Sequence, residues 1–169
     1  MLLSTERKWI MEPLKLFNNA MLLKNAIEAI DVFIQGHTAE VCPHCRNVCC
    51  INRHSYYDYA DLIYIQALGL EPPAYKEDVR DTDCCQFLSA TGCTIERSLR
   101  PFRCNWYFCG ALLKSMEDGA AKPYRKFIKE FQKIIELKKT LMDTFRTQIE
   151  TAKGDKKERR KFRRSFTPG

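Results

Sequence analysis

Cysteine is the residue type whose chemistry stands out in this sequence. The chain of 169 residues contains nine cysteines, and all of them lie between Cys42 and Cys109. Cysteines that serve only as small buried apolar residues would be dispersed through the chain. Their concentration in one segment predicts a shared chemical role instead. Thiolates are strong ligands for zinc and for iron–sulfur clusters, so metal binding is the first expectation.

The spacing of the first cysteines is typical of a metal site. In the segment CPHCRNVCC, two residues separate Cys42 from Cys45, so a short loop can turn both sulfurs toward one ion. Cys49 and Cys50 follow within five residues. The second set consists of Cys84, Cys85, Cys93, Cys104 and Cys109. Two cysteine-rich segments of this kind together indicate metal binding more strongly than a single C-x2-C pair does.

The adjacent pairs Cys49–Cys50 and Cys84–Cys85 restrict how the metal can be bound. Neighbouring side chains in an extended chain project in different directions, so both members of a pair rarely bind the same ion. Either one member does not bind metal, or the two members bind different metals. Eight thiolates match two four-thiolate zinc sites, or one cubane cluster with four cysteines left over. The spacing leaves both the metal and the number of sites open.

The order of the motifs resembles a known family. The C-x2-C…CC segment is followed by CQFL, CTI, RPFRC and a closing FC. This succession is similar to the cysteine-cluster (CxxCxxCC) family of zinc- or iron-chelating domains, and the resemblance covers residues 42–109, about 40% of the chain. The metal ligands that it implies are Cys42, Cys45, Cys49, Cys50, Cys85, Cys93, Cys104 and Cys109. The sequence departs from the family pattern by one extra residue between Cys45 and Cys49 and by the additional Cys84.

The family implies metal binding without a defined reaction. A similar cysteine cluster accompanies flagellin lysine N-methylases, which favours an iron–sulfur cluster, of the 4Fe-4S type, over Zn²⁺. No Gly-rich phosphate loop, H-E-x-x-H motif or nucleophile motif occurs in the sequence. We therefore expect a metal-binding protein without catalytic activity of its own. The alternatives are an iron–sulfur enzyme or accessory subunit, active in electron transfer or associated with a methylase, and a zinc-containing nucleic-acid-binding module.

Two long helices are predicted to flank the cysteines. Residues 14–35 have apolar residues at steps of three and four, with Pro13 in the first turn and Gly36 at the end. Residues 123–151 form the second helix. Its apolar face is predicted from a seven-residue series and the residues beside it: Ile128, Ile135, Met142 and Ile149, with Phe127, Phe131, Ile134, Leu141 and Phe145.

Little regular structure is expected between the two long helices. A short helix is predicted over residues 57–68, with Ser55 as its N-cap, and a turn is predicted at residues 89–92. The fold class that follows is mainly α, with two long amphipathic helices bracketing an irregular cysteine-rich metal-binding middle. We expect residues 1–152 to form a single domain, with the metal-binding cysteines at 42–109.

The net charge of +7 is concentrated near the C-terminal end. Residues 153–164 contain eight Lys or Arg and two acidic residues, which gives them a net charge of +6. Because like charges repel, we expect residues 153–169 to be a basic, disordered tail beyond the last helix. Nucleic acid or an anionic surface could bind residues 153–164. The main partner expected is the metal ion or cluster, and a protein partner is left open.

No apolar stretch is long enough for a secretory signal or a membrane span. The expected location is therefore the cytoplasm, where cysteines stay reduced and are available for metal.

Overall fold

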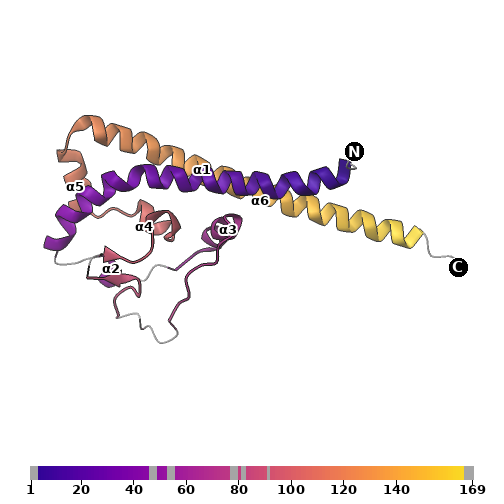
Figure 1. Ribbon diagram of the computed structural model, residues 1–169, viewed down its shortest axis with the longest axis horizontal. Helices are drawn as coiled ribbons and strands as arrows, with labels where there is room; N and C mark the ends of the chain where they lie inside the picture. The colour runs from indigo at the N-terminus through magenta and orange to yellow at the C-terminus, as the bar shows by residue number, and fades with distance from the viewer. Residues whose placement is uncertain are drawn as a thin grey trace.

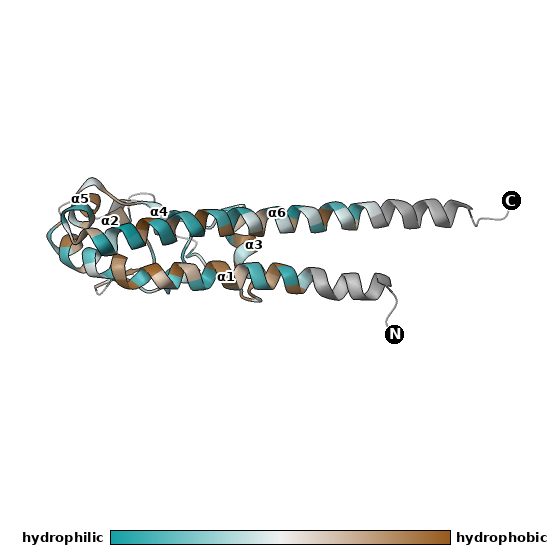
Figure 2. Ribbon diagram, turned by 90° about the horizontal axis from the view of Figure 1, so that it is seen from above, coloured by the Kyte–Doolittle hydropathy of each residue, from teal (hydrophilic) through white to brown (hydrophobic). Residues whose placement is uncertain are grey.

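Two long helices form the frame of the protein. The computed structural model describes the backbone of residues 4–45, 49–52, 56–76, 80, 83–90 and 92–165. Within these ranges, α1 spans Ser4–Val41 and α6 spans Ala121–Ser165. The helices lie side by side and run in opposite directions, and the shorter elements gather along the half of the pair where α1 ends and α6 begins (Figures 1 and 2). The predicted fold class is confirmed.

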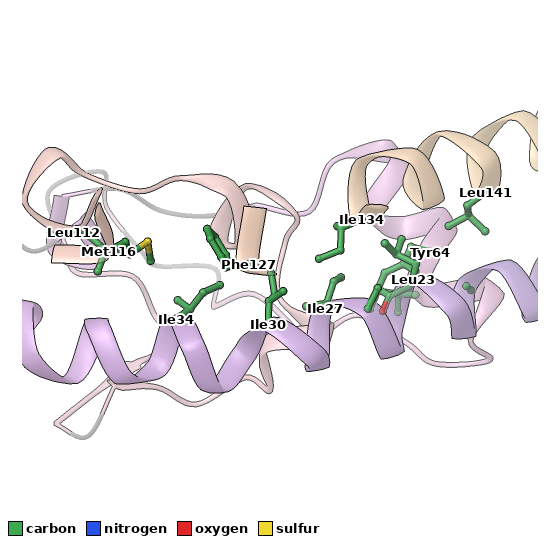
Figure 3. Close-up of a cluster of buried hydrophobic side chains, with 13 residues drawn as sticks. Leu23, Ile27, Ile30, Ile34, Tyr64, Leu112, Met116, Phe127, Ile134 and Leu141 are labelled. Carbon is green, nitrogen blue, oxygen red and sulfur yellow. The ribbon is translucent and has the colours of Figure 1, made fainter. Parts of the chain in front are cut away.

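The two helices meet along a continuous apolar seam. Apart from Ala26, the buried residues of α1 follow one another at alternating steps of three and four residues: Ala20, Leu23, Ile27, Ile30 and Ile34. This is the spacing of a coiled-coil seam. From α6, Phe127, Ile134 and Leu141 are buried, one in every seven residues. Figure 3 shows these side chains pointing toward one another across the interface.

The buried part of the predicted face of α6 is the series Phe127, Ile134 and Leu141, and the neighbouring series of Ile128 and Ile135 is more exposed. Ile128 is 37% exposed and Ile135 is 51% exposed, whereas Ile134 is fully buried. Successive residues lie about 100° apart around a helix, and both series repeat every seven residues. The repeat alone therefore could not show which of them faces α1. Contacts with α1 settle the orientation, because the ring of Phe127 stacks on Phe33 with the centroids 4.7 Å apart.

Both long helices exceed their predicted bounds. α1 starts before Pro13 and continues through Gly36 to Val41. A glycine inside a helix costs about 1 kcal/mol relative to alanine, and the packing of α1 against α5 and α6 outweighs this. α6 includes residues 153–165, so this part of the basic segment is helical where disorder was expected. Lys, Arg and Glu favour helix. Residues 166–169 lie outside the described residues.

Short elements connect the two long helices. They are η1 (Cys42–His44), α2 (Cys49–Asn52), α3 (Tyr59–Ala67), β1 (Leu88–Ser89), β2 (Gly92–Cys93), η2 (Arg97–Leu99), α4 (Arg103–Trp106) and α5 (Gly110–Asp118). β1 and β2 pair as an antiparallel hairpin, which confirms the predicted turn. Within the described residues, no helix has the length and apolar character needed to cross a membrane.

The start of α3 differs from the prediction. The predicted N-cap, Ser55, lies outside the described residues, and the helix is capped by Asp58. The Asp58 side chain accepts a hydrogen bond from the Asp61 N–H at 2.8 Å, and the Asp61 side chain accepts one from the Asp58 N–H at 3.1 Å. This reciprocal pair is a capping box. Gly69 ends the segment with φ of +72°, a conformation that favours glycine.

The one-residue offset of the seam can be tested by truncating neighbouring isoleucines. Ile134→Ala should lower the free energy of unfolding by about 2–5 kcal/mol, because it leaves a cavity between α1 and α6. Ile135→Ala should change it by less than about 1 kcal/mol, because that side chain is half exposed. Urea unfolding followed by circular dichroism measures both. A larger loss in the Ile135 variant would contradict the assigned face.

Candidate metal centre

The first two cysteines lie where α1 ends. η1 forms a single turn directly after Val41, and the Cys45 N–H donates to the carbonyl of Cys42 at 3.1 Å. The C-x2-C pair is therefore held on a tight turn at the end of the frame. His44 within this turn is exposed, which fits a loop residue. Both cysteines are half-buried.

Cys49 and Cys50 are consecutive residues of α2 and take part in different thiol groups. Burial raises the pKa of the Cys49 thiol, and the charges of Cys109 and Cys45 add to this effect. The Cys49 thiol also forms a hydrogen bond with the Cys109 thiol. Burial raises the pKa of the Cys50 thiol to about 11, with further contributions from Cys85, Cys104 and Cys93 and the least from Cys49.

These interactions divide eight of the nine cysteines into two sets of four. We call the first the Cys42 group: Cys42, Cys45, Cys49 and Cys109. We call the second the Cys50 group: Cys50, Cys85, Cys93 and Cys104. Cys42 fits the same division. Burial raises its pKa, and the thiolates that raise it further, those of Cys109, Cys45 and Cys49, all belong to the Cys42 group. All eight belong to the ligand set that the family resemblance implied.

Separate elements bring the Cys42 group together. Cys42 and Cys45 come from the end of α1, Cys49 comes from α2, and Cys109 is the N-cap residue of α5. Cys109 also packs against the apolar core beside α5. The group therefore lies at the junction of three helices, where a bound ion would join the end of α1 to the start of α5.

The Cys50 group is assembled by a strand pair and a short helix. The Cys85 N–H donates to the carbonyl of Cys50 at 2.8 Å, which ties α2 to the segment before the hairpin. Cys93 ends β2 and is paired with Leu88 across the hairpin. Cys104 lies in α4, and its N–H donates to the carbonyl of Pro101 at 2.8 Å. Gly92 allows the tight turn before Cys93 by adopting φ of +115°.

The ninth cysteine, Cys84, differs from its neighbour Cys85. It is exposed, and it is not one of the thiols that act on Cys42, Cys49 or Cys50. Cys50 is exposed as well, so the thiols that act on Cys50, and not exposure, distinguish it from Cys84. The additional cysteine relative to the family pattern is the one that belongs to neither group.

The thiols are neighbours, but they are not arranged as ligands around an ion. Among the residues that the structure describes, no three cysteine, histidine or carboxylate groups lie close enough together to hold a metal. Zinc–sulfur bonds are about 2.3 Å long, so the sulfurs of a four-thiolate site approach one another closely. Rotation of the side chains on η1, α2 and the hairpin would be needed to close either group around an ion.

Three residues near the Cys50 group were not singled out by the sequence pattern. Arg97 is buried and forms an ion pair with Asp31 of α1, and the charge of Cys93 acts on it. Burial raises the pKa of both Tyr57 and Tyr75, and the thiolates of this group raise it further. No sequence signal identified them, because their approach to the thiols depends on how the loops fold over one another.

The arginines of the RPFRC motif and the aromatic residues at 106–108 make other contacts. The Arg100 side chain donates to the carbonyl of Ile95 at 2.8 Å, and Arg103 is exposed. Trp106 is half exposed, while Phe108 packs edge-on against Phe127 and Phe131 of α6. Phe108 therefore extends the core of the frame, whereas the rings of Tyr57 and Tyr75 lie near the Cys50 group.

Polar contacts fix the cysteine region to the two long helices. On the α1 side, Arg97 pairs with Asp31, and the Tyr64 hydroxyl donates to the carbonyl of Ser98 at 3.0 Å. On the α6 side, Asp61 lies 3.6 Å from the amine of Lys138. The same carboxylate accepts a hydrogen bond from the Phe102 N–H at 3.1 Å. Phe102 lies two residues before Cys104, so these bonds position α4.

The raised pKa of Cys50 predicts slow alkylation in chelator-treated protein. At pH 8, a thiol of pKa about 11 has roughly one hundredth of the thiolate of a thiol at the ordinary 9.0. Its thiolate is intrinsically more nucleophilic, so the net rate should fall about tenfold. Mass spectrometry of iodoacetamide-treated folded and urea-unfolded protein measures this. From pH 9 to 10, the rate of Cys50 alkylation in folded protein should rise about tenfold, while the rate in unfolded protein levels off. Equal rates of Cys50 alkylation in the two states would contradict the prediction.

The comparisons with known proteins leave the site to be interpreted from its own chemistry. No family model, curated protein or solved structure matches the chain. The likeness of residues 42–109 to the cysteine-cluster family therefore rests on the motifs alone and stays a prediction. The division of eight thiols into two groups is independent of that likeness, because it follows from the neighbours of each side chain.

Proposed function

We propose that this is a metal-binding protein that holds two metal centres, each through four cysteine thiolates. The observation that supports this most directly is the separation of Cys49 and Cys50. Consecutive residues cannot easily bind one ion, and here one belongs to the Cys42 group and the other to the Cys50 group. Each group then contains four sulfurs, the ligand number of a structural zinc site and of a cubane iron–sulfur cluster.

Electrostatics favours a cation at each group. The thiols of Cys42, Cys49 and Cys50 resist ionisation because they are partly buried and because neighbouring thiolates repel one another. A bound metal ion reverses this situation, since its positive charge stabilises all four thiolates at once. Soft sulfur ligation suits both zinc and iron–sulfur clusters. The four-thiol count fits two zinc ions or two cubane clusters, while the family likeness favours iron–sulfur.

The expected role of the two centres is to organise the segment that holds them. Most of the buried apolar residues within the described chain lie on α1, α5 and α6. Between the first and last cysteine, the buried apolar side chains are mainly Ile63, Tyr64 and Ile65 of α3. Burial on this scale cannot offset the chain entropy of the loops around it. Metal coordination would supply the missing stabilisation, as it does in small metal-dependent modules.

Pairs of serine substitutions test the division into two groups. Cys42→Ser combined with Cys109→Ser should remove about one of two bound equivalents, because both residues belong to one centre. Cys42→Ser combined with Cys93→Ser should remove about two, because each disables a different centre. Elemental analysis of anaerobically purified protein measures metal content. Absorbance in the visible range with bound iron and sulfide identifies clusters, and colourless protein with zinc identifies zinc sites.

Cys84→Ser is the matched control for these variants, since it removes an exposed thiol beside the Cys50 group. It should leave the metal content unchanged. Equal losses in the two double variants would show that the eight thiols serve a single centre. Full retention of metal in both would mean that these cysteines do not bind it.

Removal of metal by a chelator should affect the cysteine region much more than the two long helices of the frame. With metal removed, most of the helical circular dichroism should remain, because the α1–α6 seam is buried without any contribution from the cysteines. Amides in residues 42–109 should exchange with solvent faster than in the metal-loaded protein. Hydrogen exchange followed by mass spectrometry measures the difference. Complete unfolding would show that the frame depends on the metal centres, and unchanged exchange would contradict their structural role.

A further inference from the structure

α6 presents a second apolar stripe that the described part of the chain covers only in part. Ile128 and Ile135 are 37% and 51% exposed, and Met142 continues the series with the same seven-residue spacing. Brown apolar bands alternate with teal polar ones along this helix in Figure 2. A repeat of seven residues is the spacing at which one helix packs along another. α1 occupies the neighbouring face, so the exposed stripe is available to a different helix.

A groove lies along part of this stripe, between α6 and Phe102. Phe102, Ile135 and Met142 form its apolar floor, and its volume is about 310 Å³. Phe102, at the N-cap of α4, is the one lining residue that α6 does not supply. Its position is fixed twice, because its N–H donates to Asp61 and the Lys138 amine lies 3.8 Å from the centre of its ring. These two contacts fix the position of Phe102, while the apolar floor of the groove remains open to solvent.

The rim of the groove is cationic. Lys138, Lys139 and Arg146 line it together with one acidic residue, Asp143. Lys139 and Arg146 lie four residues after Ile135 and Met142, which places them on the flank of the apolar stripe. Arg146 and Asp143 form a 3.4 Å pair in which both side chains are largely exposed, and such a pair contributes little. An occupant with carboxylates beside its apolar residues would complement this rim.

The distribution of charge argues against a second copy of the chain as the occupant. α6 has sixteen Lys or Arg and six Asp or Glu, a net charge of +10, and the remaining residues sum to −3. Residues 153–164, beyond the stripe, carry +6 of this charge, but two α6 helices packed stripe to stripe would still bring the cationic rims of Lys138, Lys139 and Arg146 together, which is unfavourable. Nucleic acid has the opposite charge, but phosphates and sugars offer nothing to bury against an apolar floor spaced for a helix.

We propose that this groove binds an acidic amphipathic helix of a partner protein. Apolar side chains of that helix, at steps of three and four residues, would cover Ile128, Ile135 and Met142. Its flanking Glu or Asp residues would face Lys139 and Arg146. This is the helix-in-groove mode of recognition, in which an apolar face supplies the affinity and the charges fix the orientation. The proposal does not depend on which metal the cysteines bind.

A labelled peptide tests the proposal on the full chain. The probe is a fluorescein-labelled 18-residue peptide with leucines along one helical face and glutamates elsewhere. Fluorescence anisotropy should show saturable binding that weakens as salt is raised, because the rim contacts are screened. A scrambled peptide of the same composition, with its leucines spread around the helix, should bind roughly tenfold more weakly. Equal binding of the two peptides would overturn the proposal.

Two variants of matched exposure locate the site. Ile135→Glu should weaken binding roughly tenfold by placing a carboxylate on the apolar floor, where it also repels the acidic peptide. Leu22→Glu makes the same change on α1, outside the groove, at a residue that is 53% exposed, and should leave binding unchanged. Both side chains are exposed, so both variants should keep the thermal midpoint of the parent. Similar effects of the two substitutions would refute the groove as the site.

The charge at the rim has its own control. Lys139→Glu should weaken peptide binding, and Lys139→Arg should retain it, because only the sign of the charge matters for an exposed contact.

Sedimentation of the unlabelled chain tests the competing occupant. A dimer that Ile135→Glu abolishes would assign the groove to a second copy. Tighter binding of single-stranded DNA or of anionic phospholipid vesicles, lost in the Ile135→Glu variant, would assign it to those ligands. Each of these results would overturn the proposal.

Discussion

The antiparallel packing of α1 on α6 is the interaction on which the rest of the structure depends. The seam buries Leu23, Ile27, Ile30 and Ile34 from one helix and Ile134 and Leu141 from the other. Isolated helices are only marginally stable in water, and in a folded protein most of their stability comes from packing one face against the rest of the chain. α1 ends beside the start of α6 (Figure 1). The chain between them leaves this end of the helix pair, forms the short elements and comes back to it as one long excursion. Every cysteine lies on that excursion, attached at both ends to a rigid frame.

Attachment at the ends alone would leave about eighty residues, 42–120, poorly ordered. Two buried polar anchors reduce this freedom. Arg97 reaches α1 through Asp31, and Asp61 reaches α6 through Lys138 while also holding the start of α4. A buried charge is tolerated only when it is paired and hydrogen-bonded. These anchors therefore fix where the hairpin and α4 lie, and with them the positions of Cys93 and Cys104.

The thiol groups present the opposite case, because like charges gather in them. Burial and neighbouring thiolates raise the pKa of Cys42 and Cys49 in one group and of Cys50, to about 11, in the other. The buried Arg97 is the one cation that acts on Cys93 among these interactions. Gathered thiols that ionise reluctantly by themselves gain the most from a metal cation, which stabilises their thiolates together. The groove beside α6 is physically separate, and its charges have the opposite sign.

The sequence by itself determined the mainly helical class, the two flanking helices and the cysteine segment, because each is a property of local spacing. The steps of three and four in α1 and the hairpin turn at residues 89–92 were correct for this reason. Local spacing could not decide which of two equivalent heptads of α6 is buried, since both repeat every seven residues and only Phe33 and its neighbours on α1 distinguish them. Nor could it place Asp58 rather than Ser55 at the start of α3. For the same reason, the sequence left open whether Cys49 and Cys50 belong to the same metal site. Whether adjacent thiols share a site depends on which distant cysteines approach them, and that is fixed only when α5, the hairpin and α4 pack against the frame.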